Sequence, residues 1–319
     1  MEQIKIWVSQ PSAGIFFVLV ALVVFFQLAN PIFLTPVNIA TMFRALAYPG
    51  IIAIGMALCL ISGIIDLSVG STAALSSVLF GYSLTRLDLS ILPAIGIALF
   101  ASVLIGIFNS FMILKLKIIP FIATISTMFI IRGIANFISS GYQIYPLPDG
   151  ILAIGSARPF GVSWAFVVFV VIGIVAEIIL QFSLLGWLFR AVGSDREIAR
   201  CTEVNVNQIN TIGLISISVL AAISGILISC MMNSGSPTVG SGWEFTAITA
   251  CAIGGISLFG FHGSIFGLFC GMAVIQVVQN GIVMLGVSPY LQIVVVGLIL
   301  LMAMYFDIKR RSYLDLDVI

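Results

Sequence analysis

Residues 91–113 read ILPAIGIALFASVLIGIFNSFMI, a run of 23 residues without a charged side chain. A helix of about 20 apolar residues crosses the roughly 30 Å of hydrocarbon in a bilayer, so this run predicts a transmembrane helix. Similar runs recur along the chain and predict spans at about 14–30, 44–62, 66–84, 91–113, 119–139, 163–182, 209–231, 245–260, 264–285 and 289–306. We therefore expect an all-α polytopic membrane protein with about ten transmembrane helices. The proline-containing stretch 31–48 is expected to hold a short interfacial helix before the second span.

The composition agrees with this class of protein. Of 319 residues, 61% are hydrophobic and only 8% are charged, and the mean hydropathy is +1.24. Soluble domains carry about 25% charged residues, so this chain lacks the polar groups to cover a water-exposed surface. Apolar runs extend from end to end, which predicts a single membrane domain over 1–319 whose first run is a retained span rather than a cleaved signal. The net charge of +1, without a basic stripe, argues against a nucleic-acid partner.

The positive charges predict the orientation, because Lys and Arg concentrate in cytoplasmic loops. If the N-terminus is cytoplasmic, nine of the thirteen basic residues flank the cytoplasmic ends of the spans. An even number of crossings then returns the C-terminus, with Lys309, Arg310 and Arg311, to the cytoplasm. The connections at about 140–162 and 232–244 are consequently assigned to the periplasm.

Two stretches of the chain share a spacing that suggests an internal repeat. Gly96 lies thirteen positions before Asn109, and Gly267 lies thirteen positions before Asn280. In both stretches a Pro-aromatic pair opens the next span about ten residues later. Spans four and five then correspond to spans nine and ten, an odd offset that predicts an inverted 5+5 repeat of the kind found in transporters.

The segment SGIIDLSVGS (62–71) brings an acid, glycines and hydroxyls into apolar sequence. One interpretation is a broken or re-entrant turn that brings Asp66, Ser68 and Ser71 to a transport pathway, because small residues and hydroxyls accommodate broken helices. The other is an ordinary cytoplasmic turn in which Asp66 caps the third span. The sequence alone leaves both open.

The most polar part of the chain is 186–210. Ser194 or Asp195 is suited to cap a short helix over about 196–203. Such a helix is too polar to enter lipid, so we interpret residues 190–204 as a cytoplasmic element that docks to a partner, with a solvated connector as the alternative. The candidate docking residues are Ser194, Asp195, Arg196, Glu197, Arg200 and Glu203.

The segment NSGSPTVGSGWEF (233–245) ends at the predicted eighth span. Trp243 is more typical of an interfacial anchor than of a ligand platform, but Trp243 and Glu244 are both candidates for the pathway. Asn109 and Asn280, inside spans, are further candidates, although hydrogen bonds between helices are the favoured interpretation. Arg132 and Glu177 are near enough to span ends to reach the interface.

Catalytic patterns are absent from the sequence. It has no GxxxxGK[ST] phosphate loop, no HExxH motif and no CxxC pair among its five cysteines. His262, the single histidine, has no ligand-type neighbours in sequence. We therefore expect no catalytic residue, no metal site and no enzymatic activity in this chain.

Four segments together resemble one protein family. They are GIIDLSVGS (63–71), GWLFRAVGSDREIAR (186–200), GSGWEFTAITACAIGGISLFG (240–260) and QNGIVMLGVSPYLQ (279–292). In this order they resemble the permease subunits of ribose-type ABC sugar importers, the branch that handles ribose, xylose, arabinose, galactosides and autoinducer-2. The resemblance covers nearly the whole chain. Where the family often has Glu-Leu-Asp, this chain has Glu244-Phe245-Thr246, one acid fewer.

The resemblance implies the setting in which the chain works. It implies a pore of two permeases in a bacterial inner membrane, a periplasmic sugar-binding protein, and a cytoplasmic ATPase subunit that holds ATP and Mg. This chain would then need no cofactor of its own, and residues 193–203 would match the coupling helix. The main rival is an ion-coupled secondary transporter of a small polar solute, in which Asp66, Glu177 or Glu244 carries a proton or binds sodium.

Overall fold

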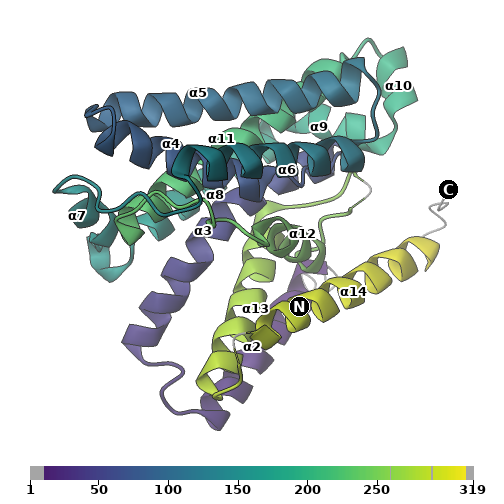
Figure 1. Cartoon of the computed structure of the whole chain (residues 1–319). Coiled ribbons are helices and arrows are strands. Elements are labelled where there is room, and N and C mark those ends of the chain that lie inside the picture. The colour runs from purple at the N-terminus through teal and green to yellow at the C-terminus, as the bar shows by residue number, and fades with distance from the viewer. Residues whose placement is uncertain (1–10, 259, 289, 314–319) are drawn as a thin grey trace.

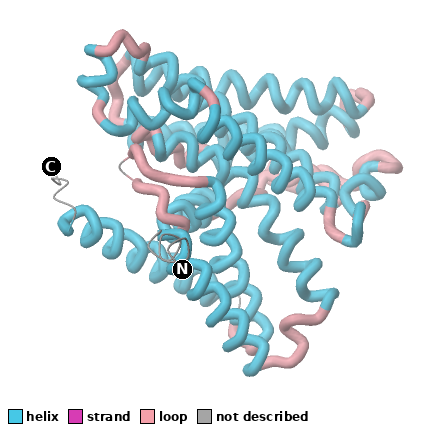
Figure 2. Tube along the Cα trace, turned by 180° about the vertical axis from the view of Figure 1, so that it is seen from behind, coloured by secondary structure: helices cyan, strands magenta, loops and turns pink. Residues whose placement is uncertain are grey.

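The computed structural model describes residues 11–258, 260–288 and 290–313, and these residues are helical almost throughout (Figures 1 and 2). Within them, β pairing is limited to an isolated bridge between Ile144 and Gly235. The elements are α2 (Pro11–Ala29), α3 (Pro36–Ile61), α4 (Val69–Thr85), α5 (Ile91–Ser110), the π-helical turn η1 (Phe111–Lys115), α6 (Pro120–Ser139), α7 (Ile151–Ser156), the 3-10 turn η2 (Pro159–Gly161), α8 (Trp164–Phe182), α9 (Leu184–Ser194), α10 (Arg196–Cys201), α11 (Val206–Met232), α12 (Trp243–Ile253), α13 (Ile265–Met284) and α14 (Tyr290–Tyr313).

Six of the described helices are long and apolar enough to cross a membrane: α3, α5 with η1, α6, α8, α11 and α13. The prediction of an all-α polytopic membrane protein is thereby confirmed. Helices also occupy the other four predicted spans, but they are shorter or less apolar within the described residues. The total of about ten crossings and the side of each terminus remain predictions.

Two expected boundaries are wrong. The predicted span 245–260 is helical only to Ile253, because the chain turns at Gly254 and Gly255, whose φ is +77°. An eleven-residue helix is only about 16 Å long, so α12 is too short to cross a bilayer by itself. The short helix expected within 31–48 is instead the first half of α3. This helix begins with Pro36 and continues past Pro49, since a proline is well tolerated in the first turn and a kink within a buried helix can be supported by its neighbours.

The centre of the protein is built from α3, α4 and α11. α3 from Leu46 to Ile61 and α4 from Val69 to Leu84 are almost entirely buried. The Ser224 hydroxyl donates to the Tyr48 carbonyl (2.8 Å) and the Ser229 hydroxyl to the Ser77 hydroxyl (2.7 Å), which fixes both helices against α11. Hydrogen bonds from hydroxyl groups hold helices together in the interior of a membrane, where no bulk water competes for the same groups.

The outer helices carry the apolar surface. α5 lies along α11, α6 lies along α4, and α2 packs with α13 away from them (Figure 1). Large apolar side chains such as Leu92, Phe137 and Phe182 are at least 80% exposed. The exposed apolar area on so many helices is larger than a water-soluble monomer exposes. Contact with lipid accounts for such a surface.

Candidate transport site

The connection between α3 and α4 returns into the protein. Cys59, near the end of α3, lies beside Gly213, two turns into α11, whereas Ser77 of α4 bonds to Ser229 near the other end of α11. Residues 62–68 therefore run alongside α11, and α4 begins partway along α11. α4 has 17 residues and is about 25 Å long. Of the two interpretations of this segment, the geometry agrees with a buried break, that is, a non-helical connection over residues 62–68 between α3 and α4.

Asp66 organises this break. Its Oδ1 accepts hydrogen bonds from the backbone N–H (2.8 Å) and hydroxyl (2.6 Å) of Ser68, and the Asn109 amide donates to its Oδ2 (3.3 Å) and to Ser68 Oγ (2.9 Å). All three side chains are completely buried. Asp66 therefore binds Ser68, the residue before α4, and does not cap the N-terminus of α4 itself. Ser71, one turn further, is also buried, and its hydroxyl has no hydrogen-bond partner.

A second break follows α11 and meets the first. The connection 233–242 is mostly buried, and a Cβ placed on Gly70 would lie 2.2 Å from the Gly240 carbonyl oxygen and 2.3 Å from Glu244 Oε2. The first turn of α4 therefore rests directly on the backbone before α12. Glu244 is only 6% exposed, and its Oε2 has no hydrogen-bond partner. A buried carboxylate without a full set of donors is costly and marks this junction as a functional candidate.

Arg132 holds the second break from the side of α6. Its Nη1 donates to the carbonyls of Pro237 (2.7 Å) and Val239 (2.8 Å). Arg132 is a lone charge within a predicted span, and we expected it to reach the membrane interface instead. The signal for its partners, a Gly-rich connection about 105 positions away, is not local.

The remaining predicted pathway residues are packed between helices. Trp243 stacks on Tyr48, halfway along α3, with ring centroids 6.3 Å apart and planes 12° apart. The amides of Asn280 and Asn38 exchange hydrogen bonds of 2.9 and 3.0 Å between α13 and α3. Asn280 thus makes the kind of hydrogen bond between helices that was favoured, whereas Asn109 bonds to Asp66 and Ser68 in the connection between α3 and α4. Glu177 accepts a hydrogen bond from the Ile265 N–H (2.7 Å) and so caps α13.

The polar segment 190–204 contains the end of α9, the extended residue Asp195 and α10. The Asp195 carboxylate caps α10 by accepting from the N–H groups of Glu197 (2.7 Å) and Ile198 (3.0 Å), as one of the two predicted caps. Arg196 Nη2 donates to the Gly63 carbonyl (2.7 Å), and Gly193 packs so closely that a Cβ there would lie 1.8 Å from the Ile61 carbonyl oxygen. The segment is thus bound to the end of α3, where the first break starts. Ser194, Glu197, Arg200 and Glu203 are exposed.

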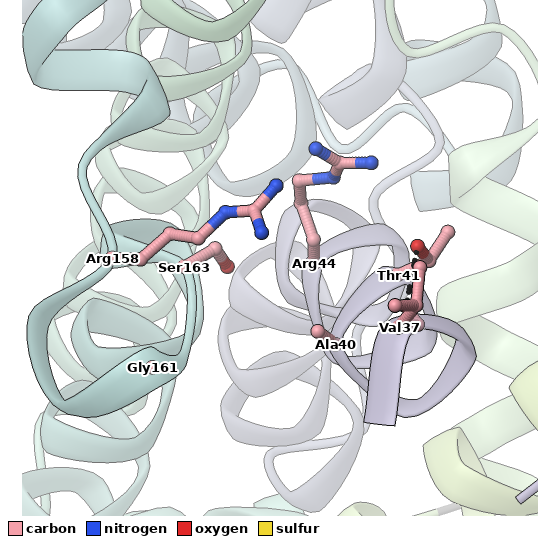
Figure 3. A pocket seen from close by; sticks show the side chains of 7 residues that line it. All are labelled: Val37, Ala40, Thr41, Arg44, Arg158, Gly161 and Ser163. Carbon is pink, nitrogen blue, oxygen red and sulfur yellow. Dashed lines mark hydrogen bonds between the residues drawn. The ribbon is translucent and has the colours of Figure 1, made fainter. Parts of the chain in front are cut away.

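Two cavities lie at the N-terminal end of α3 and at the C-terminal end of α4. In the smaller one, of about 40 Å³, Arg44 and Arg158 both reach into the space between α3 and the start of α8 beside Ser163 (Figure 3). This arrangement has the chemistry to meet an anionic group. The other, of about 420 Å³, is lined by Tyr82, Tyr142 and Tyr145 together with polar side chains. Within the described residues, no three His, Cys, Asp or Glu side chains are grouped to hold a metal ion.

Long apolar helices, two breaks that meet inside the helix bundle, and buried charges at those breaks define a multi-pass membrane transport protein. The family model described as branched-chain amino acid transport system / permease component matches residues 36–304, and the chain belongs to this family.

Curated relatives match over nearly their whole length. Ribose import permease protein RbsC of Bacillus subtilis (strain 168) is 32% identical over 304 residues, which cover 94% of this chain and 93% of that protein. The L-arabinose transport system permease protein AraH of Escherichia coli (strain K12) is 34% identical, with 88% and 86% covered. RbsC of the same E. coli strain is 30% identical, with 96% of both chains covered. No solved structure matches the chain.

Proposed function

We propose that this chain is the membrane-spanning subunit of an ATP-driven importer for a pentose or a related sugar. Relatives named as ribose and arabinose permeases, at 30–34% identity over most of both chains, support the solute class. The observation that carries the mechanism is the attachment of the α9–α10 segment to the first break, through Arg196 and the Gly63 carbonyl.

In this proposal α10 docks to a cytoplasmic ATPase subunit, which holds the ATP and Mg that this chain does not bind. The exposed charges of both signs on α10 suit a polar protein surface. A displacement of α10 pulls on Gly63 through Arg196 and pushes on Ile61 through Gly193. Since both residues lead into the 62–68 break, the displacement reaches the start of α4.

The solute passes where α4 meets the backbone before α12. Gly70 and Gly240 close this point in the present conformation, and a shift of α4 opens it. Glu244 then offers a carboxylate oxygen to sugar hydroxyls, while the Asp66–Ser68–Asn109 network keeps the moving end of α4 intact. The cavity with three tyrosines suits a polar, ring-shaped solute before it enters.

The assembly follows the orientation predicted from charge. The chain lies in a bacterial inner membrane with both termini in the cytoplasm, pairs with a second permease copy or a paralogue, and receives the sugar from a periplasmic binding protein. The connections 140–162 and 232–244 enter from the periplasmic side, and the second of them dips inward to Gly240.

Uptake in proteoliposomes tests the proposal. The chain, reconstituted with its ATPase and binding proteins, is expected to accumulate labelled ribose, arabinose or a related sugar only when ATP is present on the α10 side. A proton or sodium gradient without ATP is expected to drive no uptake. Gradient-driven accumulation without ATP would instead establish the secondary transporter and contradict the proposal.

A further inference from the structure

A cavity of about 440 Å³ lies between the connection from η1 to α6 and the residues of α10 and α11. Figure 1 shows α10 beside the turn that leads from α5 into α6. This cavity is separate from the break at 62–68 and from the contact between Gly70 and Gly240, and the hydrogen bond from Arg196 to Gly63 does not account for it. It is more than ten times larger than the two-arginine cavity of Figure 3.

Three cations line this cavity: Lys117, Arg196 and Arg200. No acidic residue is among its described lining residues. Desolvation, and then the charge of Arg200, lower the pKa of the Arg196 guanidinium. The positive charges of Arg196 and Arg200 therefore repel each other. Arg196 uses one of its five N–H donors on Gly63, and the others are available to an anion.

Two further features point to a ligand here. Asn210 lines the cavity and is only 1% exposed, yet neither its amide nitrogen nor its amide oxygen has a hydrogen-bond partner. A buried unpaired amide costs free energy, and a ligand in the cavity would recover it once the Asn210 side chain turns toward the cavity. The 20-residue helix α6 also begins at the cavity with Ile119 and Pro120, without a side-chain cap. An uncapped helix N-terminus favours anions.

The surroundings of the cavity are apolar. Leu116, Ile119 and Phe121 flank it, and each is more than half exposed. A ligand that satisfies the whole site therefore combines an anionic group with a hydrocarbon part. A soluble anion would leave this apolar flank unused.

We propose that the cavity binds the phosphate of an anionic phospholipid, with Lys117, Arg196 and Arg200 on the phosphate oxygens and the acyl chains along the apolar flank. Basic pockets beside transmembrane helices on the cytoplasmic side recognise such headgroups. The bound phosphate connects α10 to the start of α6, so the lipid stabilises the docking segment. This inference does not depend on the transported solute.

The test uses the full-length chain, purified and delipidated in detergent, with phosphatidylglycerol or phosphatidylcholine added back. Melting temperature and native mass spectrometry report binding. Lys117→Gln removes one of the cations that line the cavity. Lys115→Gln is the matched control, since Lys115 is an exposed cation two positions away that does not line the cavity. Asn210→Leu tests the buried amide without opening a void.

Phosphatidylglycerol, and not phosphatidylcholine, is expected to raise the melting temperature of the wild type and of Lys115→Gln. Lys117→Gln should require about tenfold more of this lipid, because it loses one charge-assisted hydrogen bond, and Asn210→Leu should also bind it less well. Equal responses of the two lysine variants, or of the two lipids, would overturn the proposal. Inorganic phosphate alone is expected to have no effect at millimolar concentration. If it reproduces the shift with the same dependence on Lys117, the ligand is soluble phosphate and the lipid assignment is wrong.

Discussion

Gly70 of α4 and Gly240, 170 positions later in the chain, touch backbone to backbone. A Cβ on Gly70 would lie 2.2 Å from the Gly240 carbonyl oxygen, and a Cβ on Gly240 would lie 2.4 Å from the Gly70 carbonyl oxygen. Gly240 also has a φ of +74°, which an L side chain rarely adopts. No side chain larger than hydrogen fits on either side of this junction without moving the backbone.

Gly70→Ala is expected to abolish sugar accumulation, because the added methyl group must separate α4 from the backbone before α12 and so prevents the junction from closing. Overpacking of this kind costs about 1–3 kcal/mol, so the variant should still insert and fold, with a lower melting temperature. Gly96→Ala is the matched control, since a Cβ there meets no atom within 4 Å. Wild-type uptake by Gly70→Ala would show that the junction is not the passage.

Arg196→Gln is expected to separate ATP hydrolysis from transport. The variant loses the charged hydrogen bond to the Gly63 carbonyl but keeps the Asp195 cap, so α10 still forms and docks. ATPase activity of the complex should persist while uptake falls about tenfold, in line with the loss of a bond of about 1.5–3 kcal/mol. Arg196→Lys should recover part of the uptake, because an ammonium can reach one acceptor without the geometry of the guanidinium.

The control for this measurement is Lys115→Gln, which removes an exposed positive charge from the same predicted face. Its uptake per ATP hydrolysed should equal that of the wild type. The triple variant Asp195→Asn, Arg196→Gln, Glu197→Gln should be as uncoupled as Arg196→Gln or more so. Normal uptake in the triple variant would contradict the docking role of α10.

Ser68→Ala and Asn109→Ala should each destabilise the protein by about 1–3 kcal/mol, because each leaves a buried partner of the Asp66 network without a bond. The double variant should lose less than the sum, with an interaction energy of at least about 0.5 kcal/mol. Thermal unfolding in detergent measures all three. Thr41→Ala removes a hydroxyl that bonds only within α3, so its effect should add to that of Ser68→Ala. Additivity for Ser68 and Asn109 as well would refute the network.

Local features of the sequence predicted the helices and one cap. The helix α10 and its cap Asp195 follow from residues within a few positions of each other, and most span positions follow from apolar runs of about 20 residues. The end of α12 was missed because residues 254–260 are apolar enough to continue a span, although Gly255 turns the chain. Hydropathy measures the preference of a segment for lipid, and it does not detect a glycine that ends a helix within an apolar run.

The candidate site was predicted only as a set of unusual residues. Asp66, Ser68 and Asn109 were each singled out, but their mutual bonds join α5 to the break, 41 or more positions apart. The acceptors of Arg132 and the contact of Gly70 with Gly240 are more distant still. One sequence contains the charge and the glycines but not the tertiary pairing, so it identifies candidates without showing which of them meet.

Cys201 offers a direct test of the predicted orientation. It ends α10 and is exposed, whereas Cys59, Cys230, Cys251 and Cys270 are buried. A membrane-impermeant maleimide should therefore modify the native protein at Cys201 alone. If α10 is cytoplasmic, labelling is expected in inverted membrane vesicles and not in right-side-out vesicles.

Cys201→Ser should remove this labelling and so identify its source. In that background, Tyr142→Cys reports on the opposite face, because Tyr142 lies in the predicted periplasmic connection and is 77% exposed. It should react only in right-side-out vesicles. In the proposed mechanism, every step from ATP to the sugar passes through α10, to which the ATPase subunit docks from the cytoplasm. Labelling of Cys201 from outside would therefore reverse the orientation derived from the basic residues and exclude docking of α10 to an ATPase subunit.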